Sequence, residues 1–536
     1  MATTENISHL FTPGSLATPE ASSNIPRTIL DAMYLTEAMG VNYLWVDRLC
    51  IVQDNIRHFN EQLQQMAIIY ANSSFTIIAL DGRDANHGLL GVGGKSLPRH
   101  YEQTYFEFSP EVKVLCKPYI EGEGDEPAWY TRAWTFQERA SSRKTLVVGA
   151  GSVYWQCRTS EWYEYESPNK RVLDPDDLAT WPFHALTVKR WPDFGQYISY
   201  VKGYNSRNLT FESDALKAFT AILTALSPSF PGGFLFGVPE FLFDVGLLWS
   251  ARRPLKRRKD FPSWSWVGWS GDIEFDFDKV WDPEIMDWDP TPSSHLRVVP
   301  VINWHKISAT DDSHCRINNS YSQYQSIPSM AGHSDIPISE GWLREKFRND
   351  YVHGEIEKIE HDIYLHPLLE ERPGFKFPVP VALDLATATA NSEIWSPVLR
   401  FRAERCTMSL GNVFKHQNDP DSLSGDSLLV ELCDPKGSIA GVIGPSFTNE
   451  KDDIQGTQCN LIAISMLSVS QAYEYKSIDI PEMSVFPELQ ELDPAIFYNV
   501  LWVEWENGIA YRKALGRVVK DAWERQDLEE IDIALG

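Results

Sequence analysis

Apolar and polar residues alternate along the N-terminal third of the chain in a way that predicts helices and strands in turn. Apolar residues recur every three or four positions after Pro26 and again over residues 56–70, which is the spacing of one buried helical face. Each segment is followed by a run that is almost entirely apolar, residues 41–47 and 74–80, which suits a strand buried on both faces. We therefore predict that these two runs are adjacent parallel strands in an α/β sheet.

Local signals place the ends of these elements. Gly40 is a natural stop for the first helix, and Asp54 or Asn55 is suited to cap the second. Residues 131–140 have a helical pattern. Residues 145–157 predict a hairpin that turns at two glycines.

Composition shifts divide the chain into four parts. Residues 1–25, rich in Ser, Thr, Ala and Pro, predict a disordered tail, and residues 26–165 hold the α/β pattern. Residues 166–275 predict a mixed linker and helical segment that contains FPSWSWVGWSG. Residues 276–536 predict a β-rich domain, because β-forming runs dominate there. These runs are LRVVPVINW, FPVPVAL, LRFRAE, SLLVELC, SIAGVIG, NLIAISML, NVLWVEW and IAYRKALGRVV.

The charge of the chain limits its partners. A formal net charge of −26 over 536 residues argues against nucleic acid or an anionic membrane as a partner, since both would be repelled. No run of about 18 apolar residues predicts a membrane span, and the N-terminus lacks a secretory pattern. The expected location is therefore the cytoplasm.

The cysteines favour a reducing compartment. Their number, seven, is odd, their spacing is wide and no C-x-x-C occurs, so we expect neither a disulfide framework nor a zinc site. Cys50 would need a nearby base to act as a nucleophile, and His58 is the nearest histidine in sequence, so a buried structural thiol is the alternative. No His, Asp or Glu cluster has metal-ligand spacing.

Four short motifs are weak. GVGGKS at residues 91–96 has Leu89 where a phosphate-binding loop needs its first Gly, and GAGSVY at residues 149–154 has Tyr154 where a dinucleotide fingerprint needs its third. The basic run RRPLKRRK at residues 252–259 is either a nuclear address, an anionic docking patch or a solvated loop. The tryptophans of SWSWVGW suit core packing better than a binding platform.

Two long blocks carry a family resemblance. YLWVDRLCIVQD at residues 43–54 and TRAWTFQER at residues 131–139 resemble the blocks of the fungal heterokaryon-incompatibility (HET) domain. The likeness also includes Glu61, Met66, Ile69, Tyr70, Phe75, Thr76, Ile77, Gly88, Leu89, Arg143 and residues 153–157. The segments SDALKAF, FPSWSWVGW and NVLWVEWENGIAYRKALG resemble regions that follow HET domains.

This resemblance implies a role in fungal non-self recognition and programmed cell death. HET domains are thought to be distantly similar to TIR domains, whose flavodoxin-like sheet supports NAD cleavage in some members. The resemblance thus implies a TIR/flavodoxin-like parallel sheet, with NAD as a substrate and no resident cofactor. It also implies protein partners and leaves a homo-oligomer open. The other function class is an interaction or signalling module without chemistry.

One part of the family pattern is missing. Family members usually begin with a strand resembling Y-x-x-L-S-Y-x-W-G, and residues 1–25 contain nothing like it. We therefore expect a partial domain whose sheet lacks its first strand, and this leaves an inactive truncated member as an alternative.

Carboxylates at the predicted strand ends are the first candidate site residues. Ligands of open parallel sheets bind beyond the carboxyl ends of the strands. Asp47 and Asp81 end the two predicted strands, and Asp54 follows shortly after Asp47. We expect Asp47 to be a second catalytic carboxylate, with Asp54 and Asp81 as ligand-binding residues. A structural role for Asp47, paired with an arginine, is the alternative.

The predicted helix over residues 131–140 supplies the other candidates. Trp134, Gln137 and Glu138 are spaced by three and four residues, so they can converge on one pocket with Arg132. A carboxylate can stabilise the oxocarbenium-like state formed when the nicotinamide–ribose bond breaks. We expect Glu138 to be catalytic and Arg132, Trp134 and Gln137 to bind the ligand. A structural Arg–Glu pair beneath a buried Trp is the alternative.

Overall fold

The computed structural model of the protein describes most of the chain in two compact units. The N-terminal unit comprises residues 1–187, 207–210 and 217–222, and the C-terminal unit comprises residues 188–206, 211–216 and 223–536. The four-part division of the sequence stays a prediction. The described residues are 1–18, 23–92, 96–99, 105–110, 112–115, 127–149, 152–157, 160–164, 171–172, 186, 188–251, 253–275, 281, 284, 296–325, 341–349, 359–369, 374–385, 394–416, 427–444, 454–470, 485–486, 489 and 492–536.

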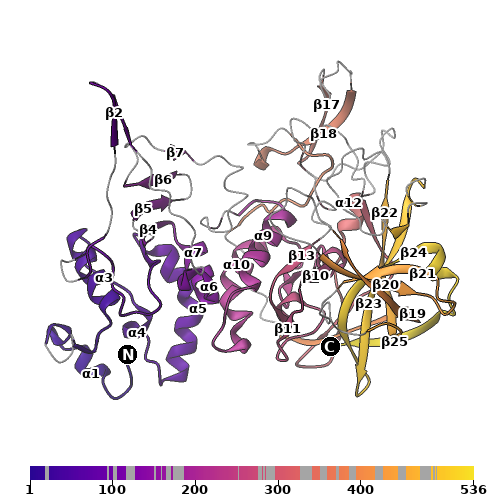
Figure 1. Ribbon diagram of the computed structural model, residues 1–536, viewed down its shortest axis with the longest axis horizontal. Helices are drawn as coiled ribbons and strands as arrows, with labels where there is room; N and C mark the ends of the chain where they lie inside the picture. The colour runs from indigo at the N-terminus through magenta and orange to yellow at the C-terminus, as the bar shows by residue number, and fades with distance from the viewer. Residues whose placement is uncertain are drawn as a thin grey trace. The chain divides into compact units, whose positions relative to one another are not determined.

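The N-terminal unit is built on a mixed sheet with the order β1-β4-β5-β6-β7 (Figure 1, indigo to purple). The strand β1 (Thr76–Ala79) is parallel to β4 (Lys144–Gly149), whereas β4 and β5 (Ser152–Cys157) form an antiparallel hairpin. The expected hairpin is thereby confirmed, although its turn at residues 150–151 lies outside the described residues. The sheet also contains β6 (Ser160–Tyr163) and β7 (Arg171–Val172), which are both antiparallel to their neighbours.

The prediction of adjacent parallel strands at residues 41–47 and 74–80 was wrong. Residues 41–46 are not assigned to a strand, and β1 pairs with β4 instead. Tyr43 is 89% exposed, which is incompatible with a strand covered on both faces. The α/β character and the β-rich C-terminal half are as expected, but the single parallel pairing of this sheet does not confirm a TIR/flavodoxin-like arrangement.

The predicted helices of this unit are confirmed. α3 (Arg27–Ala38) follows Pro26, and the chain leaves it through Gly40, whose φ of 71° suits a residue without a Cβ. α5 (Ile56–Asn72) begins after Asn55, whose side chain accepts a hydrogen bond from the His58 amide and so caps the helix. The last helix is α7 (Ala133–Ser141). Shorter elements are α1 (Ile7–Leu10), η1 (Ser15–Ala17), α4 (Asp47–Cys50), β2 (Tyr105–Ser109), β3 (Val112–Leu115) and α6 (Ala128–Thr131).

The first residues of the chain are held against the segment around Asp54. The sequence predicted that these first residues belong to a disordered tail. The Ala2 amide donates to the Arg48 carbonyl at 2.9 Å, and the Ala2 carbonyl accepts from the Gln53 amide at 3.0 Å. The Asp54 carboxylate accepts from both the amide and the hydroxyl of Thr4. Ala2 is fully buried, so this contact is part of the packing of the unit.

The first part of the C-terminal unit has a tryptophan-rich core. Trp264 and Trp266 are fully buried and Trp269 is 7% exposed, as expected for core packing. Each indole N–H donates to the protein; that of Trp264 reaches the Pro397 carbonyl at 2.9 Å. The elements here are α9 (Phe194–Asn205), η2 (Glu212–Asp214), the end of α10 (Thr220–Leu226), η4 (Ser227–Ser229), β8 (Phe234–Leu235), β9 (Val238–Pro239), α11 (Phe243–Gly246), β10 (Trp249–Ala251), β11 (Lys256–Arg257), η5 (Trp266–Gly268), β12 (Trp269–Ser270) and β13 (Ile273–Phe275). η3 (Lys217–Phe219) and the start of α10 belong to the N-terminal unit.

The basic run at residues 252–259 is partly structural rather than fully solvated. Arg258 is 1% exposed, and its guanidinium donates to the side chains of Glu212 and Asn205 and to backbone carbonyls. Arg257 donates to the carbonyls of Phe261 and Gly268. These buried carbonyl oxygens need donors, and arginine supplies several from one side chain.

A closed ring of strands forms the second part of this unit (Figure 1, orange to yellow). β19 pairs with β22, and the ring continues through β23, β24, β21 and β20 back to β19. The interior is filled by side chains such as Met408, Leu461 and Trp523, as small barrels require. The ring strands are β19 (Trp395–His416), β20 (Ser427–Cys433), β21 (Ile439–Ile443), β22 (Gln458–Val469), β23 (Ala495–Glu506) and β24 (Ile509–Val519).

Further elements extend this sheet or lie beside it. β14 (Leu296–Pro300) pairs with β22, and β25 (Glu529–Leu535) pairs with β19. Seven of the eight predicted β-runs contain strands; the exception is FPVPVAL, whose prolines cannot donate to a sheet. The remaining elements are β15 (His305–Ser308), β16 (His314–Arg316), α12 (Tyr321–Gln325), β17 (Leu343–Asn349), β18 (Ile359–Leu365), η8 (Pro367–Leu369) and α14 (Lys520–Glu524). No helix of the described residues is long and apolar enough to cross a bilayer.

Candidate functional site

Helix α7 presents one accessible face in the N-terminal unit. Trp134 and Glu138 are four residues apart and therefore lie one turn above each other. Both are only partly buried, whereas Phe136, Gln137 and Arg139 between and beside them are buried. The sequence of this helix thus sends most of its side chains into the core and leaves Trp134 and Glu138 partly accessible.

The Glu138 carboxyl group is electrostatically unusual. The pKa of this group is raised from 4.5 to about 7, chiefly by burial of the carboxylate and in part by the negative charge of Asp47. Two groups act in the opposite direction: the positive charge of Arg132 and a hydrogen bond from the Tyr70 hydroxyl both favour the ionised form. A carboxyl group with a pKa near 7 is present in both protonation states at neutral pH.

Tyr70 reaches Glu138 from the last turn of α5, which contacts α7. Burial raises the pKa of the Tyr70 hydroxyl well above its usual value, and the nearby charges of Glu138 and Asp47 act in the same direction. The phenol therefore stays protonated and is a hydrogen-bond donor. Its ring meets Trp45 edge to face, with the ring centroids 5.7 Å apart.

Asp47 belongs to the same cluster, although it does not end a strand. It is the first residue of α4, and its carboxylate accepts from the Arg48 amide at 2.6 Å. A negative charge in the first turn of a helix is favourable because the amides there have no helical acceptors. Asp47 is exposed, and its charge acts on both Tyr70 and Glu138.

Arg132 is held in place through its backbone. It precedes α7 as the N-cap residue, and it forms a bridge with Asn208, whose carbonyl accepts from the Ala133 amide at 2.9 Å. The Arg132 carbonyl accepts from the Arg207 guanidinium at 3.3 Å. The Arg132 side chain is exposed, and its charge acts on Glu138. The structure therefore brings both Asp47 and Arg132 within electrostatic reach of Glu138.

Three other candidates are placed differently. Gln137 is 3% exposed and its Oε1 accepts from the Ala221 amide at 3.4 Å, so it lies on a different face of α7 from Glu138. Asp54 is bound to Thr4, and those hydrogen bonds lower its pKa. Asp81 follows β1 and lies beside Gly149 of β4. A Cβ added at Gly149 would lie 3.1 Å from the Oδ1 atom of Asp81. A ligand-binding role for these three residues stays a prediction.

The cluster is suited to proton transfer and to cation stabilisation. A partly accessible carboxyl group with a pKa near the working pH can accept or donate a proton. Its ionised form can also stabilise a developing positive charge, while a guanidinium such as that of Arg132 can bind a phosphate group. The aromatic rings of Trp45, which contacts Tyr70, and of Trp134, on α7, can pack against a ligand.

Thiol and metal chemistry have less support. The Nδ1 atom of His58 accepts from the Val52 amide at 3.2 Å and is thereby occupied, while Cys50 is exposed rather than buried. Within the described part of the chain, no three His, Cys, Asp or Glu side chains group as metal ligands would, and the described cysteines are free thiols.

Sequence reasoning missed Tyr70 as a member of the cluster. The pattern placed this residue on the apolar stripe of its helix, where a tyrosine ring packs like any other apolar group. Its hydroxyl partner, Glu138, is distant in sequence. The available signal was a polar tip at the end of an apolar stripe, since a buried hydroxyl needs a partner.

The comparison with protein families gives a match over most of the N-terminal unit. Residues 3–138 match the family model described as Heterokaryon incompatibility protein (HET), which agrees with the family expected from the sequence blocks. The match includes Asp47, Tyr70, Arg132 and Glu138. Comparisons with curated proteins and with solved structures returned no match.

Proposed function

We propose that this chain, which carries a HET segment at residues 3–138, acts in fungal non-self recognition and triggers cell death by cleaving NAD. The substrate is an oxidised nicotinamide dinucleotide, and the bond that breaks joins the nicotinamide nitrogen to C1′ of the ribose. The reacting group is Glu138, with Asp47, Tyr70 and Arg132 around it.

The reaction needs no resident cofactor. As the C–N bond breaks, its electron pair leaves with nicotinamide, and positive charge develops on the ribose ring. Ionised Glu138 stabilises this oxocarbenium-like state, as carboxylates do in glycoside cleavage. Water then adds its oxygen to C1′ and passes its proton to Glu138, which releases it to solvent. The products are nicotinamide, ADP-ribose and one proton.

The neighbouring residues have defined parts in this proposal. Arg132 binds a phosphate oxygen of the substrate, because a guanidinium matches phosphate geometry. The ring of Trp134 stacks on the nicotinamide. The Tyr70 hydroxyl orients the carboxylate of Glu138 through its hydrogen bond. Asp47 opposes ionisation of Glu138 and so keeps its pKa near neutrality.

One observation carries the proposal: a partly accessible carboxyl group has a pKa of about 7 inside the segment that matches the HET family. Burying a carboxylate is unfavourable unless its charge is compensated, so the protein pays in stability to hold Glu138 in this environment. Perturbed carboxyl groups of this kind gather at functional sites.

Cell toxicity tests this proposal. We would induce the full chain, the Glu138→Gln variant and the Glu37→Gln variant in a fungal host, and measure growth and cellular NAD. Glu37 is an exposed carboxylate on α3, so its substitution is the matched control. We expect growth arrest and NAD loss with the full chain and the control, and neither with Glu138→Gln at equal protein level.

A second candidate is an interaction module without chemistry. Several large apolar side chains of the N-terminal unit are exposed, among them Phe11, Tyr43 and Ile68 at 80%, 89% and 61%. Such side chains favour contacts with another protein. Growth arrest by Glu138→Gln without NAD loss would support this candidate and contradict the catalytic one.

A further inference from the structure

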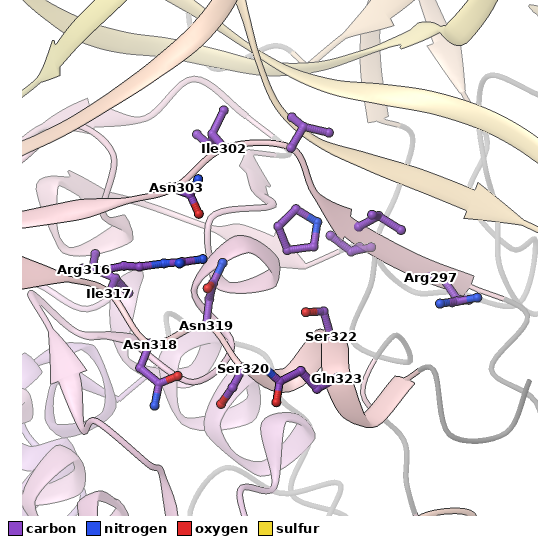
Figure 2. A pocket seen from close by; sticks show the side chains of 14 residues that line it. Arg297, Ile302, Asn303, Arg316, Ile317, Asn318, Asn319, Ser320, Ser322 and Gln323 are labelled. Atoms are coloured by element: carbon purple, nitrogen blue, oxygen red, sulfur yellow. The ribbon is translucent and has the colours of Figure 1, made fainter. Parts of the chain in front are cut away.

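A polar groove in the C-terminal unit has a size that suits a small organic ligand (Figure 2). Its volume is about 670 Å³, which lies within the usual range of ligand sites. One wall is β14 with the residues that follow it, 297–303, and the other is the segment of residues 316–323 at the start of α12. This groove is separate from the Glu138 cluster, and its ligand is independent of the NAD cleavage proposed for that cluster.

The lining of the groove has a positive charge in a chain of net charge −26. It contains two arginines, Arg297 and Arg316, and no aspartate or glutamate. Neither guanidinium has an ion-pair partner among the residues that the structure describes. The Nε atom of Arg297 is buried and has no hydrogen-bond acceptor there. A buried donor normally has an acceptor, and an oxygen of a ligand in the groove can supply one to this atom.

The remaining lining residues supply neutral hydrogen-bonding groups and an apolar wall. Figure 2 shows Arg316 reaching toward Asn319, with Asn303 nearby, while Arg297 lies at the far side of the groove. The apolar wall comes from Val299 and Val301, which are 37% and 39% exposed. Amide and hydroxyl groups beside an arginine match a ligand that has an anionic group and several hydroxyls. The polar lining residues are Asn303, Asn318, Asn319, Ser320, Ser322 and Gln323.

The groove is held in shape from beneath by buried hydrogen bonds. The carboxylate of Asp244, which is fully buried and does not line the groove, accepts from the Asn319 amide at 2.6 Å and from the Trp304 indole at 2.9 Å. The Tyr321 hydroxyl donates to the Val298 carbonyl at 3.3 Å. The Ile317 amide donates to the Trp304 carbonyl at 3.0 Å, which joins the two walls. Such support keeps the site preorganised.

From these observations we propose that the groove binds a sugar phosphate, either as a free sugar phosphate or as part of a nucleotide. The phosphate binds Arg316, because a guanidinium donates two parallel hydrogen bonds to phosphate oxygens. The sugar hydroxyls bind the amide groups of Asn303 and Asn318. The acceptor for Arg297 comes from the other end of the ligand.

Isothermal titration calorimetry of the full chain tests this site with three probes: ribose 5-phosphate, adenosine 5′-monophosphate and adenosine. We expect at least one of the two phosphates to bind and adenosine not to bind. Binding of ribose 5-phosphate identifies the sugar phosphate itself as sufficient, whereas binding of the nucleotide alone adds a need for the base. Equal binding of adenosine and the nucleotide, or no binding of either phosphate, would overturn the proposal.

Two variants place the bound phosphate in the groove. Arg316→Gln removes an exposed charge and should weaken phosphate binding at least about tenfold, as expected for a hydrogen bond between charged groups. Arg525→Gln removes another exposed arginine of the same unit that is outside the groove, and should leave the affinity unchanged. Hydrogen exchange should show protection of residues 314–323 by the bound phosphate. Unchanged affinity in Arg316→Gln would assign any binding to another site and overturn the proposal.

Discussion

Replacement of Glu138 by glutamine should stabilise the N-terminal unit at alkaline pH. The carboxylate is desolvated and lies near the negative charge of Asp47, so the folded protein disfavours its ionised form. Glutamine has almost the same shape, keeps an oxygen that can accept from Tyr70, and carries no charge. A carboxylate retained for a structural ion pair predicts the opposite result, a loss of stability on substitution.

The size of the effect follows from the pKa. Between pH 4.5 and about 7 the folded state binds more protons at Glu138 than the unfolded state, so stability falls as the pH rises through this window. The two pKa values differ by about 2.5, which corresponds to roughly 3 kcal/mol once the pH exceeds both. At about pH 5 the cost is below about 1 kcal/mol, because the folded carboxyl group is still protonated.

Thermal unfolding at about pH 5 and about pH 8.5 measures this difference. We expect the melting temperature of Glu138→Gln to exceed that of the wild type by several degrees at pH 8.5, and to differ little at pH 5. Glu37→Gln, which removes an exposed carboxylate, should change neither value appreciably. A lower melting temperature of Glu138→Gln at pH 8.5, or an equal gain at both pH values, would refute the reasoning.

Other consequences can be measured independently. In a carboxyl NMR titration, Asp47→Asn should lower the pKa of Glu138 from about 7, because it removes a like charge, whereas Arg132→Gln should raise it; shifts of the opposite sign would contradict the cluster. Tyr70→Phe should also raise that pKa, because the ionised carboxylate loses a hydrogen bond, and an unchanged titration would show that the bond does not form. Trp523→Ala should lower the unfolding free energy of the C-terminal unit by about 3–5 kcal/mol in a denaturant titration, since the indole is fully buried in the barrel; a loss below about 1 kcal/mol would argue against that packing.

Helices and the order of elements were predictable where a periodic apolar stripe coincided with an end signal. α5 is an example, because its apolar residues recur at helical spacing and Asn55 caps it. The prediction of a strand at residues 41–47 was wrong because a short apolar run has no periodicity that distinguishes a buried strand from an extended connection. Tyr43 in that run is exposed, and no feature of the sequence marks it as such.

The placement of charged residues was less predictable, because it depends on partners that are distant in sequence. Arg258 lies in a basic run that suggested a surface, yet its donors are taken up by buried carbonyls and by Glu212. The clustering of Asp47 with Arg132 and Glu138 was expected from strand-end reasoning, but Asp47 reaches the cluster from the start of α4. Their catalytic roles stay predictions.

Release of nicotinamide from NAD by the purified chain tests most directly the claim that Glu138 is the catalytic carboxylate. We predict that nicotinamide and ADP-ribose form in equal amounts. Their rate of formation should rise as the pH passes through about 7, because Glu138 ionises there. Glu138→Gln should lower this rate at least ~100-fold, and Glu37→Gln should leave it unchanged. Nicotinamide release by Glu138→Gln at the wild-type rate, or no release by the wild-type protein, would contradict the account.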